Sequence, residues 1–194
     1  MKPFAVEPDD PRSQLERMLA GDWYIADDPD IQRQFRRALR ETARFNDVYA
    51  QDPDASQGIL GGLLGGLGEG AHVRAPLRAD YGSRLFIGAG TFVNFGLVAL
   101  DVVDVRIGER CQLGPNIQLL TPIHPLEREA RAQGWEAAEP ITLEDDVWLG
   151  GGVIVCPGVT IGAGSVIGAG SVVTSDVQPG VLAVGSPARV VREL

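Results

Sequence analysis

A six-residue repeat runs through the C-terminal half of the chain. Branched apolar residues open successive hexads at Leu143, Leu149, Val155, Ile161, Ile167 and Val173. A second small or branched residue follows four places later, at Val147, Val153, Val159, Ser165, Ser171 and Val177. A period of six fits neither the 3.6-residue period of a helix nor the alternation of a strand. It predicts a solenoid in which each hexad makes one short strand and one turn, and three hexads close a triangular coil.

The glycines of the repeat are expected to form the corners of this coil. Glycine adopts a positive φ without the steric cost that a side chain imposes. We therefore expect left-handed backbone at Gly150, Gly152, Gly162, Gly164, Gly168 and Gly170.

The same register continues towards the N-terminus, with two interruptions. Hexads open at Ile87, Val93, Ile107, Leu113 and Leu119, with partners at Thr91, Leu97, Cys111, Ile117 and Ile123. The phase slips near 101–105, and residues 122–140 have no hexad pattern at all. Insertions in a solenoid form loops on one face, often the face that binds ligands. We expect an excursion loop over 122–140, and His124 lies at its start.

The N-terminal part of the chain has a different pattern. Apolar residues recur at helical spacing among charged ones, which predicts two amphipathic helices within 11–67, separated by the Asp-Asp-Pro-Asp of 27–30, and a short third helix from about Asp54. The expected organisation is a single domain: a helical segment at 1–70 packed on one end of the coil, a solenoid at 71–188, and a C-terminal tail at 189–194.

Composition excludes several classes of protein. The formal charge of −9 argues against a nucleic-acid surface, which needs clustered cations. The N-terminus lacks the apolar stretch of a signal peptide, and no run is long enough to cross a bilayer. Cys111 and Cys156 fall in hexads, where a reduced core thiol is the simplest interpretation. These features predict a cytoplasmic protein with no nucleic-acid or membrane partner.

Several segments resemble one known family. They are AGDWYIADDPD, RADYGSRLFIGAGTFVNFGLVALDVVDVRIG, PNIQLLTPIHPLE, PITLEDDVWLGGGVIVCPGVTIGAGSVIGAGSVVTSDV and GSPARVVREL. Together they resemble the maltose and galactoside O-acetyltransferases, the sugar branch of the hexapeptide-repeat acyltransferases, from about Leu15 to Arg192. The resemblance implies a mainly β fold, a left-handed parallel β-helix. It also implies a homotrimer with active sites between neighbouring subunits, acetyl-CoA as co-substrate, a small sugar as acceptor and no metal.

Three residues are expected to carry the chemistry. Acetyl transfer from a thioester to an alcohol needs a base for the hydroxyl proton and donors for the oxyanion. The expected base is His124, within TPIHPLE, because imidazole titrates near neutral pH. By resemblance Glu136 orients it, although the excursion also contains Glu127, Glu129 and Glu139, and any of these can equally be a solvated loop charge. Asn94 matches the family's transition-state amide; alternatively it occupies a positive-φ corner, as Asn does in turns.

The resemblance also assigns binding residues. Sugar hydroxyls are expected to contact Asp80, Tyr81 and Asp101. The residues matched to the coenzyme A groove and its nucleotide end are Gly151, Ala169, Thr174, Ser175, Arg189 and Arg192, with Trp148 as a wall of the acetyl site. Family members often have Lys at the position of Ser175, so one expected cation is missing here. Trp148 is alternatively a trimer contact.

Two rival interpretations remain at this stage. Trimeric β-helices also include zinc carbonic anhydrases, but that site needs three imidazoles and the chain has only His72 and His124. The other rival is a non-catalytic scaffold or a module that binds sugar or coenzyme A without turnover, because a fold alone does not establish activity.

Overall fold

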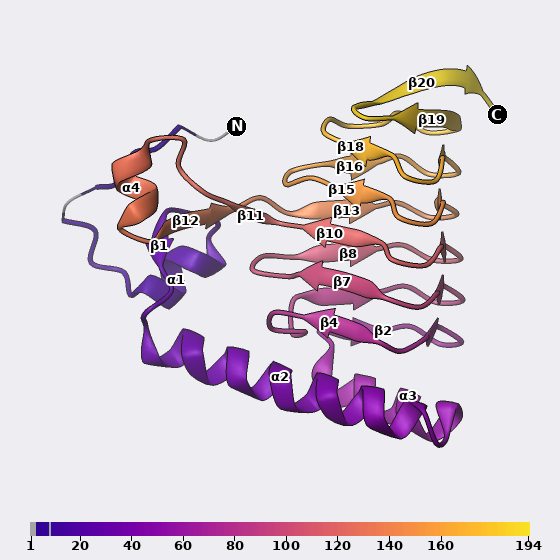
Figure 1. The fold of residues 1–194 in the computed structure, drawn as a ribbon, viewed down its shortest axis with the longest axis horizontal. Helices are drawn as coiled ribbons and strands as arrows, with labels where there is room; N and C mark the ends of the chain where they lie inside the picture. The colour runs from indigo at the N-terminus through magenta and orange to yellow at the C-terminus, as the bar shows by residue number, and fades with distance from the viewer. Residues whose placement is uncertain (1–2, 8) are drawn as a thin grey trace.

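The computed structural model describes residues 3–7 and 9–194 and is a parallel β-solenoid with helices at one end (Figure 1). The described residues form four helices: α1 (Gln14–Leu19), α2 (Pro29–Tyr49), α3 (Pro53–Leu63) and α4 (Arg128–Ala132). The predicted mainly β solenoid fold is confirmed.

Three parallel sheets form the walls of the solenoid. The first wall contains β2 (Gly66–Leu67), β5 (Leu85–Ile87), β8 (Val105–Ile107), β13 (Ile141–Leu143) and β16 (Thr160–Ile161). The second contains β3 (His72–Val73), β6 (Phe92–Val93), β9 (Gln112–Leu113), β14 (Trp148–Leu149), β17 (Val166–Ile167) and β19 (Val181–Gly185), with β20 (Ala188–Glu193) antiparallel to β19. The third contains β4 (Leu77–Ala79), β7 (Leu97–Leu100), β10 (Gln118–Leu120), β15 (Ile154–Val155) and β18 (Val172–Val173).

The chain turns three corners in each coil. We call the turn from the first wall to the second the first corner, the turn from the second to the third the second corner, and the turn from the third back to the first the third corner. The excursion leaves from the third corner between β10 and β13, and it contains β11 (Pro122–Ile123), α4 and β12 (Trp135–Ala138). Each corner repeats from coil to coil, so residues at equivalent positions form columns along the solenoid.

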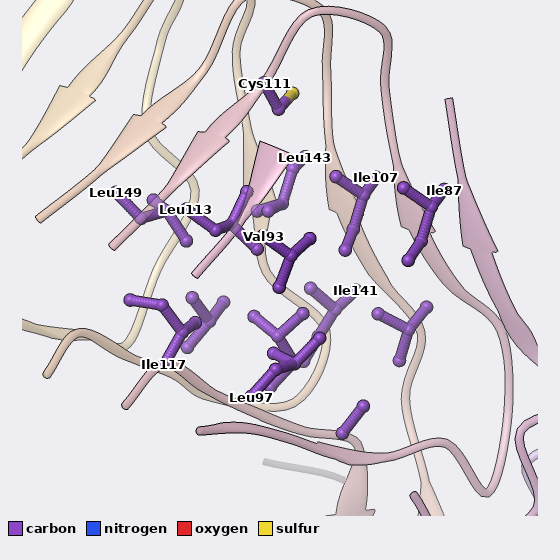
Figure 2. Packing of buried hydrophobic residues seen from close by; sticks show 14 of the residues in the cluster. Ile87, Val93, Leu97, Ile107, Cys111, Leu113, Ile117, Ile141, Leu143 and Leu149 are labelled. Atoms are coloured by element: carbon purple, nitrogen blue, oxygen red, sulfur yellow. The ribbon is translucent and has the colours of Figure 1, made fainter. Parts of the chain in front are cut away.

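The hexad residues fill the interior. Figure 2 shows Ile87, Val93, Leu97, Ile107, Cys111, Leu113, Ile117, Ile141, Leu143 and Leu149 packed together inside the coils. All of these side chains are at most 3% exposed. Burial of such side chains stabilises the fold by roughly 1.5–3 kcal/mol each, which explains why the six-residue pattern is so regular.

The phase slip at 101–105 corresponds to a longer third corner. In the first wall Phe86 pairs with Gly66 and Arg106, so these coils contain 20 residues, whereas Thr142 pairs with Thr160, so a later coil contains 18. The two additional residues lie between β7 and β8, because the earlier steps of that coil keep the spacing of six.

The glycine prediction is only half correct. Gly152, Gly164 and Gly170 have positive φ, as expected. Gly150, Gly162 and Gly168 do not, and their role is different: a Cβ on Gly150 would lie 2.5 Å from the backbone nitrogen of Ala169 in the next coil. These three glycines allow neighbouring coils to approach closely. Some left-handed corner positions are instead filled by Arg110, Asn116 and Asp146.

The N-terminal helices cover one end of the solenoid. Asp28 and Asp52 accept hydrogen bonds from the first turns of α2 and α3, and each is followed by Pro at the first helical position. Ala38, Phe45, Leu60 and Leu63 of these helices join the main core. Figure 1 shows α2 running along the end of the coils and on towards the group formed by α1, β1 (Tyr24–Ile25), α4 and β12.

Residues 189–194, expected as a tail, lie largely within β20, which pairs with β19 as the last strand of the second wall. Of the helices in residues 3–7 and 9–194, none is both long enough and apolar enough to span a bilayer.

Candidate active site

A small antiparallel sheet positions the residues of the excursion. Its strands follow the order β1-β12-β11, with Tyr24 opposite Glu136 and Pro122 opposite Ala138. Cross-strand partners share a face of a sheet, and residues two apart along a strand do as well. Tyr24, Glu136 and Pro122 therefore share one face, and His124, two residues beyond Pro122, follows on that face.

His124 is exposed at the end of β11. Its Nδ1 lies 3.3 Å from the carbonyl oxygen of Trp135, the residue before Glu136. The tautomer with the proton on Nδ1 donates to this carbonyl and leaves the lone pair of Nε2 free to accept a proton. A backbone carbonyl thus orients the ring, and within the described residues no hydrogen bond joins His124 to Glu136.

A pocket of about 240 Å³ opens on this face of the small sheet. Its polar wall comes from the small sheet, from the end of β4 and from α2: Tyr24, Gln32, Asp80, Tyr81 and Glu136. Its apolar wall consists of Ala26, Ile31, Phe35, Val102 and Pro122. The pocket is a concavity of mixed polarity, which suits a small polyhydroxylated ligand. Pro122 belongs to its wall, and His124 lies two residues further along the chain, outside the lining.

The carboxylates of the pocket interact strongly. Burial, followed by the neighbouring charges of Asp101 and Glu136, raises the pKa of Asp80 from 3.8 to about 6. Burial is also the main cause that raises the pKa of the Tyr24 and Tyr81 hydroxyls, with contributions from Glu136 and Asp80. Both tyrosines are therefore neutral hydrogen-bond donors at neutral pH.

Asp101 has a different role from the one expected. Its side chain is fully buried, and its carboxylate accepts hydrogen bonds from the backbone nitrogens of Tyr81 at 2.9 Å and Arg84 at 3.1 Å. The oxygens that were expected to contact a sugar are thus bound to the turn that follows Asp80. Asp101 fixes that turn from behind, and through it the positions of Asp80 and Tyr81.

Asn94 lies at the second corner, directly after β6. Its Oδ1 accepts a hydrogen bond from the backbone nitrogen of Phe95 at 2.8 Å, and within the described residues its Nδ2 donates none. The amide hydrogens are therefore available to a ligand. The alternative role as a positive-φ corner is wrong, because the left-handed residue of this turn is Gly96, with φ 82°.

The second corner aligns several of the residues expected to contact coenzyme A. Backbone hydrogen bonds link successive coils in a column: Asn94 to Leu113, Gly114 to Leu149, Gly150 to Ile167, and Gly168 to Ala183. Gly151, Ala169 and Arg189 lie along this column, since Arg189 pairs with Val184 at the end of β19. Four strand spacings make the column about 19 Å long. Trp148, 55% exposed, stands at the start of β14 on the wall beside it.

Other predicted residues lie elsewhere on the chain. Thr174 and Ser175 follow β18 and therefore lie at the third corner, in the column of Asp80 and Asp101 but several coils away. Arg192 pairs with Leu182 and lies three residues further along β20 than Arg189. One chain thus presents two groups: the pocket of mixed polarity with His124 near the third corner, and the column of residues with Asn94 at the second.

Among the pocket residues that sequence reasoning did not select are Tyr24, Gln32 and Phe35. Gln32 and Phe35 lie one turn apart, on the N-terminal part of α2 that extends beyond the coils (Figure 1). Their helical spacing was visible in the sequence, but it indicated only an amphipathic helix. The two-residue strand that carries Tyr24 left no periodic signal.

The remaining chemically active side chains lie outside this site. No group of three or more His, Cys, Asp or Glu residues within 3–7 and 9–194 is placed to hold a metal ion. His72 stacks on Phe92 of the next coil at 6.3 Å between ring centroids. Cys111 is buried in the core, Cys156 is half-buried, and burial raises the pKa of both thiols.

Comparison with known proteins identifies the family. Residues 17–68 match the maltose acetyltransferase hexapeptide capping motif, and residues 140–175 match the bacterial transferase hexapeptide of six repeats. Nodulation protein L of Rhizobium meliloti (strain 1021) is 45% identical over 179 residues, which cover 92% of this chain and 98% of the relative.

Solved structures agree with these matches. A maltose O-acetyltransferase from Clostridium difficile 630 superposes with a TM-score of 0.93 at 37% identity, covering 95% of this chain and 99% of the other. A galactoside acetyltransferase in complex with coenzyme A gives 0.90 at 35% identity, covering 94% and 91%. The fold and the site define a hexapeptide-repeat acyltransferase. The chain belongs to the family of the maltose and galactoside O-acetyltransferases, and the predicted resemblance is confirmed.

Proposed function

We propose that this protein transfers the acetyl group of acetyl-CoA to a hydroxyl of a small sugar, directly within a ternary complex. The observation that carries the proposal is the orientation of His124, whose Nδ1 faces the Trp135 carbonyl at 3.3 Å while its Nε2 remains free, two residues along the chain from Pro122 in the wall of a polar pocket. The solved relative that binds coenzyme A supports the choice of donor. The free thiols of Cys111 and Cys156 favour a reducing compartment, and we place the protein in the cytoplasm.

The reaction follows from these groups. The acceptor hydroxyl donates its proton to Nε2 of His124 as its oxygen attacks the thioester carbonyl carbon. The amide hydrogens of Asn94 stabilise the oxyanion. Collapse of the tetrahedral intermediate breaks the C–S bond, and the proton held by His124 passes to the departing sulfur, giving the acetyl ester and free coenzyme A. Arg189 and Arg192 bind the phosphates of the nucleotide end, and Gly151 and Ala169 leave room for the pantetheine arm.

We further propose that the active protein is a homotrimer. His124 and the pocket lie near the third corner of a chain, whereas Asn94 and the groove lie at the second. A site that needs both groups forms where the third corner of one protomer faces the second corner of another. Thr174 and Ser175, at the third corner, then reach the groove of the neighbouring protomer.

Release of the coenzyme A thiol in the presence of acetyl-CoA and a panel of sugars tests this function. His124→Ala is expected to lower kcat by two or more decades and leave coenzyme A binding intact, because general-base catalysis contributes about 10²–10⁴-fold. His72→Ala serves as the matched control, since His72 stacks on Phe92 away from the pocket. Near-normal turnover in His124→Ala would remove the assigned base, and binding without thiol release in the unaltered protein would favour a non-catalytic module.

A further inference from the structure

The acceptor pocket contains an excess of negative charge that no protein group balances. Asp80 and Glu136 both line it, and Asp101 lies directly behind the turn that carries Asp80. No Lys or Arg side chain is among the lining residues, and the part of the chain that the structure describes offers neither Asp80 nor Glu136 an ion pair. The nearby Arg84 is bound to Asp104 at 3.1 Å instead.

A second feature of the pocket also indicates a ligand. Tyr81 is only 6% exposed and lines the pocket, and no hydrogen bond of its hydroxyl is found within residues 3–7 and 9–194. The hydroxyl is not among the fully buried unpaired atoms of these residues, so it is accessible at the pocket wall and free to hydrogen-bond to a ligand. Tyr24, 1% exposed, presents its own hydroxyl beside Glu136.

Neutral sugars can form hydrogen bonds in this pocket but cannot neutralise its negative charge. Their hydroxyls can donate to carboxylates, but they leave the mutual repulsion of Asp80, Glu136 and Asp101 in place. A cation placed between Asp80 and Glu136 forms charge-assisted hydrogen bonds and removes that repulsion. The opposite wall, with Phe35 and Val102, suits the less polar face of a sugar ring.

We propose that the preferred acceptor carries an ammonium group close to the hydroxyl that is acetylated, as an amino sugar does, and that Asp80 and Glu136 bind that ammonium. This inference rests on the proposed function. The ammonium has no lone pair while it is protonated, so the hydroxyl remains the nucleophile and the product is an ester. The formal charge of −9 on the chain also favours the approach of a cation.

Three acceptors of similar size test the proposal: glucosamine, glucose and N-acetylglucosamine, each with acetyl-CoA at pH 7. We expect kcat/KM for glucosamine to exceed the values for both neutral sugars by about tenfold, which is typical of a single well-placed charge pair. The product should be cleaved by hydroxylamine, as an ester is and an amide is not. Equal kcat/KM values for all three would overturn the inference alone, whereas no thiol release with any acceptor would overturn the proposed function together with it.

Substitutions locate the selectivity in the pocket. In Glu136→Gln the ratio of kcat/KM for glucosamine to that for glucose should fall to about threefold or less, because one of two carboxylates has lost its charge. Any general loss of activity cancels in this ratio. Glu69→Gln, which neutralises an exposed carboxylate at a first corner, should leave the ratio unchanged. An unchanged ratio in Glu136→Gln would contradict the proposal.

The ratio of kcat/KM for glucosamine to that for glucose should also fall as the pH is lowered from 7 to 5. The titratable groups that face Asp80 are Asp101, Glu136, Tyr24 and Tyr81, and α2 contributes only uncharged residues to the pocket. The pKa of Asp80 is about 6, so protonation removes one charge of the binding pair within this range. A ratio that stays constant over this range would contradict binding of the ammonium by Asp80.

Discussion

At the scale of single residues, the negative charge of Asp80, which is proposed to bind the acceptor, lowers the stability of the fold. Its carboxylate is half-buried beside two other carboxylates, and its pKa is raised from 3.8 to about 6 in the folded protein. A raised pKa means that folding favours the protonated acid. The ionised form therefore costs stability, and this cost grows as the pH rises from about 4 through 6 and is fully present at neutral pH.

Asp80→Asn is accordingly expected to stabilise the fold at pH 7 while it weakens acceptor binding. The free energy of unfolding should rise by about 1–2 kcal/mol at pH 7, and the gain should be largely lost near pH 3, where the acid is mostly protonated in both states. Urea denaturation at the two pH values measures the difference. Asp104→Asn provides the control of opposite sign, since Asp104 pairs with Arg84 and Arg106 and its loss should destabilise slightly. A destabilised Asp80→Asn at pH 7 would contradict the assigned charge repulsion.

How far the sequence predicts the site depends on the residue. His124 could be selected because it begins the one long break in the hexad pattern, and Asn94 because of its family motif. The sequence could not show that Asp101 is buried, since a carboxylate at the start of the longer corner looks the same whether it faces solvent or backbone. It also could not show that a backbone carbonyl, which carries no sequence signal, orients His124.

At the scale of elements, the glycines of the corners separate into two kinds. Gly150→Ala is expected to destabilise the solenoid by about 3 kcal/mol, because its Cβ would lie 2.5 Å from the backbone of Ala169 and neither coil can move alone. Gly164→Ala is the matched control: its φ is 68°, but nothing lies within 4 Å of the added Cβ, so strain of about 1 kcal/mol is expected. Thermal unfolding of both variants checks that Gly150→Ala lowers the stability more than Gly164→Ala does. Equal losses of stability would show that close approach of the coils contributes nothing.

The excursion shows which elements periodicity cannot predict. The hexads fixed the positions of the solenoid strands because each coil repeats one local pattern over a continuous core. The small sheet β1-β12-β11 joins residues 24–25 to residues 135–138 across more than half of the chain. Strands of two to four residues carry too few side chains to show an alternation, so this pairing depends on tertiary packing alone.

At the scale of the whole molecule, the separation of the two functional groups determines how the site is assembled. Along one chain the pocket and His124 lie near the third corner, while Asn94 and the column that includes Gly151 and Ala169 occupy the second. In a triangular solenoid these corners are different edges of the same prism. In the proposed homotrimer, the second corner of one protomer would lie against the third corner of the next, and this contact would repeat at each interface.

Mixing two inactive variants tests this arrangement. His124→Ala and Asn94→Ala are each expected to be nearly inactive alone, but in trimers assembled randomly from equal amounts of both, about a quarter of the interfaces combine an intact His124 with an intact Asn94 from the neighbour. Each mixed trimer has one such interface among its three, so co-expression of the two variants with different tags, followed by purification of mixed trimers, should restore about a third of the unaltered activity. Mixing the purified homotrimers without exchange should restore none. If the mixed trimers stay inactive while each variant remains folded and trimeric, His124 and Asn94 must act within one chain, and the separation of the two corners would then require a different explanation.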